Sequence, residues 1–189
     1  MSEKKSSRTL INIIGIPSIL AIIIAGDAYM NLPLFSIFIG IVLLLGAKEI
    51  PILVKESKGD PFLPILFIFL IILQVIRHPL INFQITVFEL LILITILTML
   101  FELFRKKKTP FLNISCIVFS FIWVGVMLGS LSLLRNIPVI GFSITMSIFL
   151  TVWICDTAAF GFGLKFGRSK ILPTISPNKT WVGSIAGMI

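Results

Sequence analysis

The chain has 189 residues, of which 57% are hydrophobic and only 13% are charged, and its mean hydropathy is +1.11. A soluble domain of this length needs a polar surface that this composition cannot supply, so an ordinary soluble protein is excluded. The apolar runs are continuous rather than alternating, which excludes a transmembrane β-barrel and predicts an all-α, polytopic membrane protein.

Six apolar stretches are long enough to cross about 30 Å of hydrocarbon, given a rise of about 1.5 Å per residue. They predict one integral membrane domain over residues 1–189, with six complete spans and the start of a seventh. The predicted spans cover residues 10–26, 31–50, 61–77, 80–103, 111–134, 137–160 and, incompletely, 181–189. The first stretch follows Lys4, Lys5 and Arg8 and so also fits a signal peptide, but the apolar stretches after it favour a retained helix.

The basic residues gather on one side of these spans. If the N-terminus is cytoplasmic, 14 of the 16 Lys and Arg residues fall on the cytoplasmic side, and only Arg77 and Arg135 fall on the other. The positive-inside rule therefore predicts a cytoplasmic N-terminus in the cytoplasmic (inner) membrane. Anionic membrane lipids at that face account for the net charge of +8, so no nucleic-acid partner is predicted.

Ionisable residues inside a membrane span are costly, so each is a candidate functional residue. Glu89 is predicted near the middle of the fourth span, either as a functional group or as a structural contact with a hydroxyl such as that of Thr86 or Thr95. Glu49 and Glu102 are predicted at the cytoplasmic ends of spans, and Glu49 is a candidate for lining a cavity there.

Other features of the spans suit packing better than chemistry. Cys116 and Cys155 lie in apolar stretches and are interpreted as buried small hydrophobic residues, and the single histidine, His78, lacks partners for a metal site. Gly125 and Gly129 form a G-x-x-x-G pattern that packs spans either within one chain or between two copies, which leaves a homodimer open.

The groups that suit phosphate chemistry gather in the last predicted cytoplasmic segment. Asp156 follows the apolar residues of the sixth span, where a carboxylate can bind a divalent cation or orient a basic partner. Gly161 and Gly163 allow another backbone or a lipid headgroup to approach closely. With no strand before these glycines, neither a P-loop nor a dinucleotide-binding fingerprint is predicted.

The sequence S-P-N-K-T-W, which begins at Ser176, is predicted to open the next helix. Ser176 would be the N-cap and Pro177 the first helical residue, leaving backbone N–H groups free to bind phosphate. Lys179 adds a positive charge and Thr180 a second hydroxyl. From the residues alone, an ordinary basic loop beside the membrane is an equal alternative.

The pairing of D-T-A-A-F-x-x-G with S-P-N-K-T-W-x-G resembles the phosphatidate cytidylyltransferase (CDP-diacylglycerol synthase) family, whose pattern is D-T-G-A-Y/F-x-x-G followed by S-P-x-K-T-W-E-G. The matching residues are Asp156, Thr157, Ala159, Phe160, Gly163, Ser176, Pro177, Lys179, Thr180, Trp181 and Gly183. The earlier spans resemble the family in hydropathy only, with Glu49 as a weak positional match.

Two departures from the family pattern stand out. Val182 occupies the position where the family usually has Glu. The chain also ends at Ile189, before the family's C-terminal signature, S-x-x-K-R-x-x-x-x-K-D followed by H-G-G-x-x-D-R. The resemblance therefore predicts the N-terminal two-thirds of the family's domain, and whether this chain alone is active is left open.

The resemblance implies that CTP and phosphatidate react at the cytoplasmic face to give CDP-diacylglycerol and pyrophosphate, with a divalent cation, Mg²⁺, as cofactor. It implies catalytic roles for Asp156 and Lys179, with Asp156 also holding the metal together with residues outside this chain. The implied substrate-binding residues are Ser176, Asn178, Thr180, Lys165, Arg168 and Lys170.

Two alternatives come from other classes of protein. One is a CTP-dependent lipid or polyprenol kinase, against which the S-P-N-K-T-W sequence argues. The other is a non-catalytic membrane protein, such as a transport or partner subunit. Transport predicts polar residues along several spans, but Glu89 is the only carboxylate predicted near the membrane centre.

Overall fold

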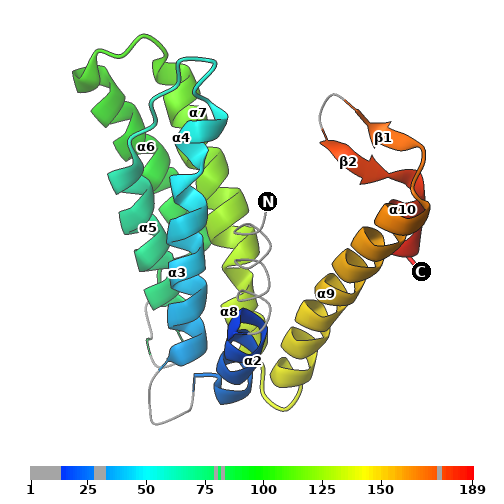
Figure 1. Cartoon of the computed structure of the whole chain (residues 1–189). Coiled ribbons are helices and arrows are strands. Elements are labelled where there is room, and N and C mark those ends of the chain that lie inside the picture. Colours follow the sequence, from blue (N-terminus) through cyan, green and yellow to red (C-terminus); the bar gives the residue numbers. More distant parts are fainter. Residues whose placement is uncertain (1–13, 28–32, 79–80, 82–83, 174–175) are drawn as a thin grey trace. The chain divides into compact units, whose positions relative to one another are not determined.

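The computed structural model describes residues 14–27, 33–78, 81, 84–173 and 176–189 (Figure 1). The described residues are mainly helical, which confirms the predicted all-α class apart from one two-stranded hairpin. The chain divides into two compact units, residues 1–142 and residues 143–189. Lys4, Lys5, Arg8 and the beginnings of the first, second and fourth predicted spans lie outside the described residues.

The first unit is a bundle of helices. Its elements are α2 (Ile16–Ala25), α3 (Leu34–Lys48), α4 (Ile50–Leu53), α5 (Leu63–Ile76), α6 (Val87–Arg105), α7 (Pro110–Ser120), the π-helix η3 (Phe121–Leu128) and α8 (Ser130–Arg135). Several begin with proline in the first turn, as Pro64 does in α5 and Pro110 in α7, because a helix needs no N–H donor there.

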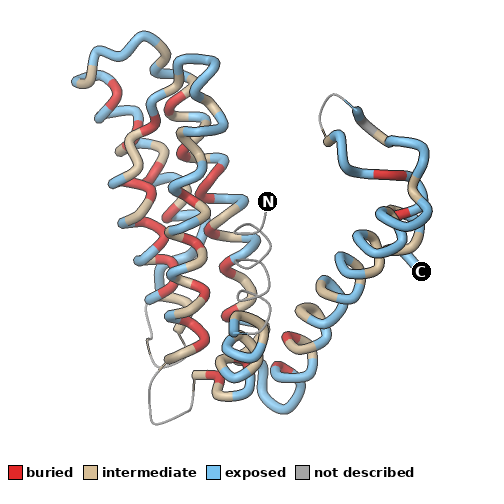
Figure 2. The backbone as a smooth tube through the Cα atoms, viewed as in Figure 1, coloured by how far each residue is buried: buried red, intermediate tan, exposed pale blue. Residues whose placement is uncertain are grey.

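Buried side chains recur every three or four residues along the bundle helices, so each helix turns one face toward the core (Figure 2). Phe35, Ile39 and Leu43 form this face on α3. Phe69 of α5 meets Phe121 of η3 edge to face, with ring centroids 6.3 Å apart. The core is therefore made by helices that lie far apart in the sequence.

The G-x-x-x-G pattern packs helices within one chain. A Cβ atom on Gly125 would lie 2.7 Å from Cδ2 of Leu70, so η3 approaches α5 closely. At Gly129, a Cβ atom would lie 2.9 Å from both Nη1 of Arg77 and Nε2 of Gln74. The Arg77 guanidinium also donates to the carbonyl of Gly125 at 3.1 Å, which fixes the C-terminal end of α5 against η3.

Four helical segments in the described part of the chain are long and apolar enough to cross a membrane. They are Leu34–Leu53, Val87–Arg105, Pro110–Arg135 and Gly141–Phe166. Two further apolar helices, Ile16–Ala25 and Leu63–Ile76, are shorter and coincide with the first and third predicted spans. The chain is thus an integral membrane protein whose four long helices match predicted spans, with shifted ends.

The prediction that Glu89 lies near the middle of a span is wrong. Glu89 lies in the first turn of α6, where its side chain accepts from the backbone N–H of Thr86 at 2.7 Å while Thr86 Oγ1 accepts from the N–H of Glu89. This reciprocal pair is a capping box that starts the helix. Contact with Thr86 is confirmed, whereas Thr95 bonds to the carbonyl of Leu91 instead. Glu49 is exposed at the junction of α3 and α4.

The second unit contains most of α9 (Gly141–Phe166), followed by β1 (Lys170–Leu172), β2 (Ser176–Thr180) and α10 (Trp181–Ala186). The two strands are antiparallel, with Lys170 opposite Thr180 and Leu172 opposite Ser176. The register changes between these two pairs, which identifies an irregularity in the short ladder. The hairpin was not predicted from the sequence.

Candidate active site

Glycines allow α10 to pack directly on α9. A Cβ atom on Gly183 would lie 2.5 Å from the carbonyl oxygen of Ala159 and 3.1 Å from Cα of Gly163. One on Gly187 would lie 2.9 Å from the carbonyl oxygen of Cys155. Because Gly187, which directly follows α10, meets an earlier residue of α9 than Gly183 does, α10 runs antiparallel to α9. Small residues from both sequence motifs therefore form one contact.

Thr180 joins the hairpin to this contact. Its Oγ1 accepts from the N–H of Gly183 at 3.2 Å, so Thr180 is the N-cap of α10. Only 4% of Thr180 is exposed, and a Cβ atom on Gly167 would lie 2.4 Å from its Oγ1. The predicted substrate-binding hydroxyl of Thr180 is thus buried and holds β2, α10 and the end of α9 together.

The prediction that a helix opens at Ser176 is wrong. Ser176 and Pro177 lie in β2, and the helix begins four residues later than expected, at Trp181. Both Ser and Thr are good N-cap residues, and the contact with Gly183 selects Thr180. Pro177 is tolerated because both strands of a two-stranded sheet are edge strands.

Four basic side chains gather around the hairpin. Lys165 is in the last turn of α9, Arg168 in the connection, Lys170 in β1 and Lys179 in β2, and all four are exposed. Successive residues of a strand face opposite ways, so burial of Thr180 turns Lys179 outward beside the exposed Asn178. Lys165 Nζ lies 5.3 Å from the centre of the Phe166 ring. Because Lys170 is paired opposite Thr180, it lies on the other face of the hairpin from Lys179, so the exposed cations form a cationic surface that covers both faces of the hairpin.

Asp156 lies apart from this surface along α9. The helix continues for ten residues beyond Asp156, to Phe166, which is six residues past the predicted end of this span at residue 160. With about 1.5 Å of rise per residue, Asp156 and Lys165 are separated by roughly 13 Å along the helix axis. Asp156 is exposed and follows Cys155, the residue that meets Gly187. The carboxylate and the hairpin cations therefore flank opposite ends of the α9–α10 contact.

Asp156 is the sole acidic residue of the second unit, against four basic ones. Among the residues that the structure describes, no three His, Cys, Asp or Glu side chains cluster as a metal site would require. A protein-only metal cage is therefore not formed in this part of the chain. A single carboxylate can still serve Mg²⁺, which is usually held by one or two carboxylates together with substrate phosphates and water.

A family model described as "Cytidylyltransferase family" matches residues 6–189, nearly the whole chain. This chain belongs to the cytidylyltransferase family. The match covers the upstream helices as well as the two motifs, although the upstream helices carry no comparable motif.

Curated family relatives are named phosphatidate cytidylyltransferase. Those of Staphylococcus haemolyticus and Staphylococcus aureus (strain COL) are 27% and 29% identical over 182 residues, or 96% of this chain. The match covers 67% and 66% of their lengths, respectively. The Brucella suis relative is 43% identical over 65 residues, which are 34% of this chain and 24% of that protein. The chain thus spans at most about two thirds of these relatives. No solved structure matches it.

Proposed function

We propose that this protein is a phosphatidate cytidylyltransferase of phospholipid biosynthesis, which transfers the cytidylyl group of CTP to phosphatidate. The observation that carries the proposal is the direct packing of the two family motifs, Gly183 on Ala159 and Gly163, beside a hairpin with four exposed cations. The names of the staphylococcal and Brucella relatives support it.

In the proposed reaction, a phosphate oxygen of phosphatidate attacks the α-phosphorus of CTP. The new P–O bond forms the diphosphate of CDP-diacylglycerol, and the bond from the α-phosphorus to its bridging oxygen breaks to release pyrophosphate. Both substrates are polyanions that repel each other, so fixed cations are required to hold them together. The site must also lie at the membrane interface, because one substrate is a lipid.

We assign the hairpin cations to substrate binding. Lys179 and Ser176 of β2 would contact phosphate, with Asn178 between them as a further hydrogen-bonding side chain. Lys165, Arg168 and Lys170 would attract CTP and anionic headgroups by charge. Thr180 acts through structure, because its hydroxyl caps α10 and so fixes the neighbouring Lys179.

We propose Mg²⁺ as the divalent cation, with Asp156 as its ligand from this chain. A bound Mg²⁺ would neutralise phosphate charge and so favour the approach of one polyanion to the other. The fit is that of one carboxylate that shares the ion with substrate phosphates, which agrees with the absence of a carboxylate cluster among the described residues.

We further propose six membrane spans, a cytoplasmic N-terminus and a cytoplasmic active face in the inner membrane. The distribution of 14 of 16 basic residues supports this topology, and CTP is available on that side. The most apolar window of α9 has no buried residue, so this helix offers surface to lipid or to a second copy in a homodimer.

The test follows two phosphorus atoms of CTP. Membranes that contain the chain are incubated with phosphatidate and CTP labelled with ³²P at either the α- or the γ-phosphate. Cytidylyl transfer puts the α label into extractable lipid and the γ label into pyrophosphate. Lipid that carries only the γ label identifies a kinase instead. A staphylococcal relative assayed in parallel establishes that the conditions support activity, and no α label from this chain would then refute its activity.

A further inference from the structure

We propose that two joined loops of the first unit bind the phosphate group of an anionic phospholipid in the bilayer, with Lys58 and Lys106 as the cations in contact with it. The loops, which we call the lysine loops, comprise residues 54–60, which follow α4, and residues 106–109, which connect α6 to α7. The proposed site is separate from the hairpin of the second unit and is independent of the cytidylyltransferase reaction.

The lysine loops lie at one surface of the membrane. The long apolar helical segments next to them end at Leu53 and Arg105 and begin at Pro110, so the loops lie where spans leave the hydrocarbon. The hydroxyl of Thr109 donates to the carbonyl of Lys58 at 3.1 Å, which joins one loop to the other. Figure 1 shows the end of α4 and the connection from α6 to α7 at the same end of the bundle. Both loops therefore meet the headgroups of the same leaflet.

Both lysines have an unfavourable backbone conformation. The φ angles of Lys58 and Lys106 are 58° and 49°, in the left-handed region where a side chain is strained. The N–H of Gly59 donates to the carbonyl of Val54, and the N–H of Lys58 donates to that of Lys55, both at 3.0 Å. These are the two bonds of a Schellman motif, in which the left-handed residue is usually glycine. Because such strain is concentrated at functional sites, we infer that the lysine side chains are used.

The same two lysines carry charge that the protein does not neutralise. Arg105 and Lys107 both pair with Asp60, at 3.0 Å and 2.7 Å. Lys58 and Lys106 are exposed, and neither forms an ion pair with any residue that the structure describes. The ion pairs hold the loops together while these two cations remain available to an anion, and a phosphate group is the anion that a membrane surface supplies.

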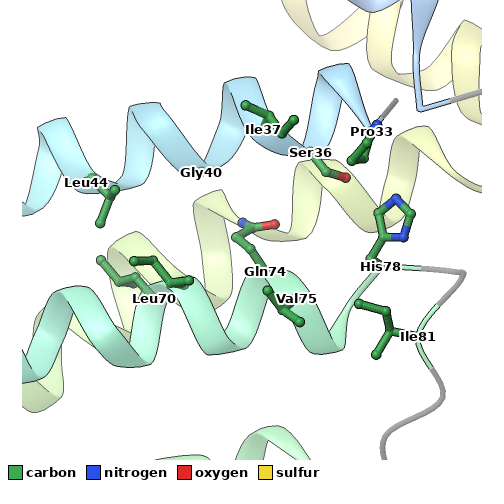
Figure 3. Close-up of a pocket in the computed structure, with 11 residues that line it drawn as sticks. Pro33, Ser36, Ile37, Gly40, Leu44, Leu70, Gln74, Val75, His78 and Ile81 are labelled. Atoms are coloured by element: carbon green, nitrogen blue, oxygen red, sulfur yellow. The ribbon is translucent and has the colours of Figure 1, made fainter. Parts of the chain in front are cut away.

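The neighbouring apolar side chains favour a lipid over a soluble phosphate. Leu53, Phe104 and Phe111 border the lysine loops in the sequence and are 75%, 83% and 85% exposed. Apolar side chains beside lysines are typical of a surface that enters the boundary between headgroups and acyl chains. The groove between α3 and α5 is no alternative phosphate site, because neither Lys nor Arg is among the described residues that line it (Figure 3).

The first experiment compares two photoreactive lipids that differ only in headgroup charge. The protein is placed in phosphatidylcholine vesicles with a trace of phosphatidylglycerol or of phosphatidylcholine that carries a diazirine near the glycerol end of one acyl chain. Mass spectrometry should find about five-fold more label on Phe104 and Phe111 from the anionic probe, the effect expected of one lysine near an anionic headgroup. Equal labelling by the two probes would refute the proposal.

Paired variants assign the effect to particular lysines. Lys58→Gln combined with Lys106→Gln should make the two probes label equally. Lys55→Gln combined with Lys108→Gln is the matched control, because both are exposed lysines of the same part of the chain without a left-handed backbone, and it should keep the preference. An equal loss in both pairs would replace the site by diffuse attraction. Sodium phosphate should not reduce the anionic label more than sodium chloride of the same ionic strength, and a larger reduction would identify a soluble ligand.

Glycine substitution tests whether strain is retained for binding. In neutral detergent, Lys58→Gly should raise the thermal midpoint by about 3 °C, because glycine adopts the left-handed conformation without strain. In vesicles, the same variant should reduce the preference for the anionic probe. Lys108→Gly is the control and should not raise the midpoint. A lower midpoint in Lys58→Gln with the lipid preference intact would show that the lysine only stabilises the end of its helix, and would overturn the proposal.

Discussion

The two units treat their charged residues in opposite ways. In the first unit, Asp60, Glu102, Arg105, Lys107 and Asn113 form a network, which we call the clasp. In the second unit, the charged side chains are exposed, and among the described residues none of them forms an ion pair. The first set stabilises the fold, and the second set is available to a ligand.

The clasp joins the segment before α5 to the end of α6 and the start of α7. Glu102 is 4% exposed, and it accepts from Asn113 at 3.0 Å and from Arg105. The other end of the Asn113 amide accepts from the N–H of Asp60 at 2.7 Å. Arg105 also donates hydrogen bonds to the backbone carbonyl and the carboxylate of Asp60, and its guanidinium lies over the Phe62 ring. The bonding capacity of these groups is used within the protein, which argues against a direct role in binding substrate.

Breaking the clasp should have the largest effect on stability. Arg105→Ala leaves the buried Glu102 carboxylate without its cation, and loss of one partner of a buried pair costs about 3 kcal/mol. The thermal midpoint in detergent should fall, while turnover per folded molecule is retained. Lys108→Ala, a nearby exposed lysine, is the control. A loss of turnover without a loss of stability would place the clasp in the active site.

Removal of a hairpin cation should lower turnover and leave stability unchanged. Lys179→Ala should lower kcat/KM for CTP about 100-fold, the range found when one preorganised group that stabilises the transition state is removed. The thermal midpoint should change little, because Lys179 is exposed. Lys55→Ala, which removes an exposed lysine of the first unit, should leave both quantities unchanged. Unaltered turnover in Lys179→Ala would withdraw this residue from the proposed site.

The α9–α10 contact should affect both stability and activity, because it is a packing contact within the unit that carries the proposed site. Gly183→Ala places a Cβ atom 2.5 Å from a backbone oxygen of Ala159, and overpacking of this kind costs about 1–3 kcal/mol. We expect faster protease cleavage at the hairpin and reduced activity, with the first unit intact. Gly161→Ala is the matched control, since its Cβ atom meets nothing. Equal protease resistance of the two variants would contradict the packing.

Sequence reasoning found the membrane class and the motif residues but misplaced the local structure around them. Hydropathy identifies helices well because a bilayer leaves backbone polar groups no alternative. Hydropathy is averaged over a window of residues, so it placed Glu89 inside a span, although the sequence contains the capping-box pair Thr86 and Glu89. At the second motif, two N-cap residues were available, and only the tertiary contact of Thr180 with Gly163 and Gly183 decides between them.

The smallest predicted effect is the pH dependence of the stability that the Lys107–Asp60 ion pair of the clasp contributes. A hydrogen bond from Lys107, reinforced by the charges of Lys107 and Arg105, lowers the pKa of Asp60 below the usual 3.8 of an aspartate side chain. At a pH between the Asp60 pKa of the folded protein and that of the unfolded chain, the unfolded chain binds more protons at this carboxyl. The stabilisation is therefore complete above about pH 4 and is lost as the pH falls through the pKa of the folded protein. Both side chains are about half exposed, so solvent screening limits the effect to at most about 1 kcal/mol. Thermal midpoints measured from pH 6 to pH 3 should therefore fall slightly less in Lys107→Ala than in the unaltered protein. Parallel curves would show that the Lys107–Asp60 pair contributes nothing to stability.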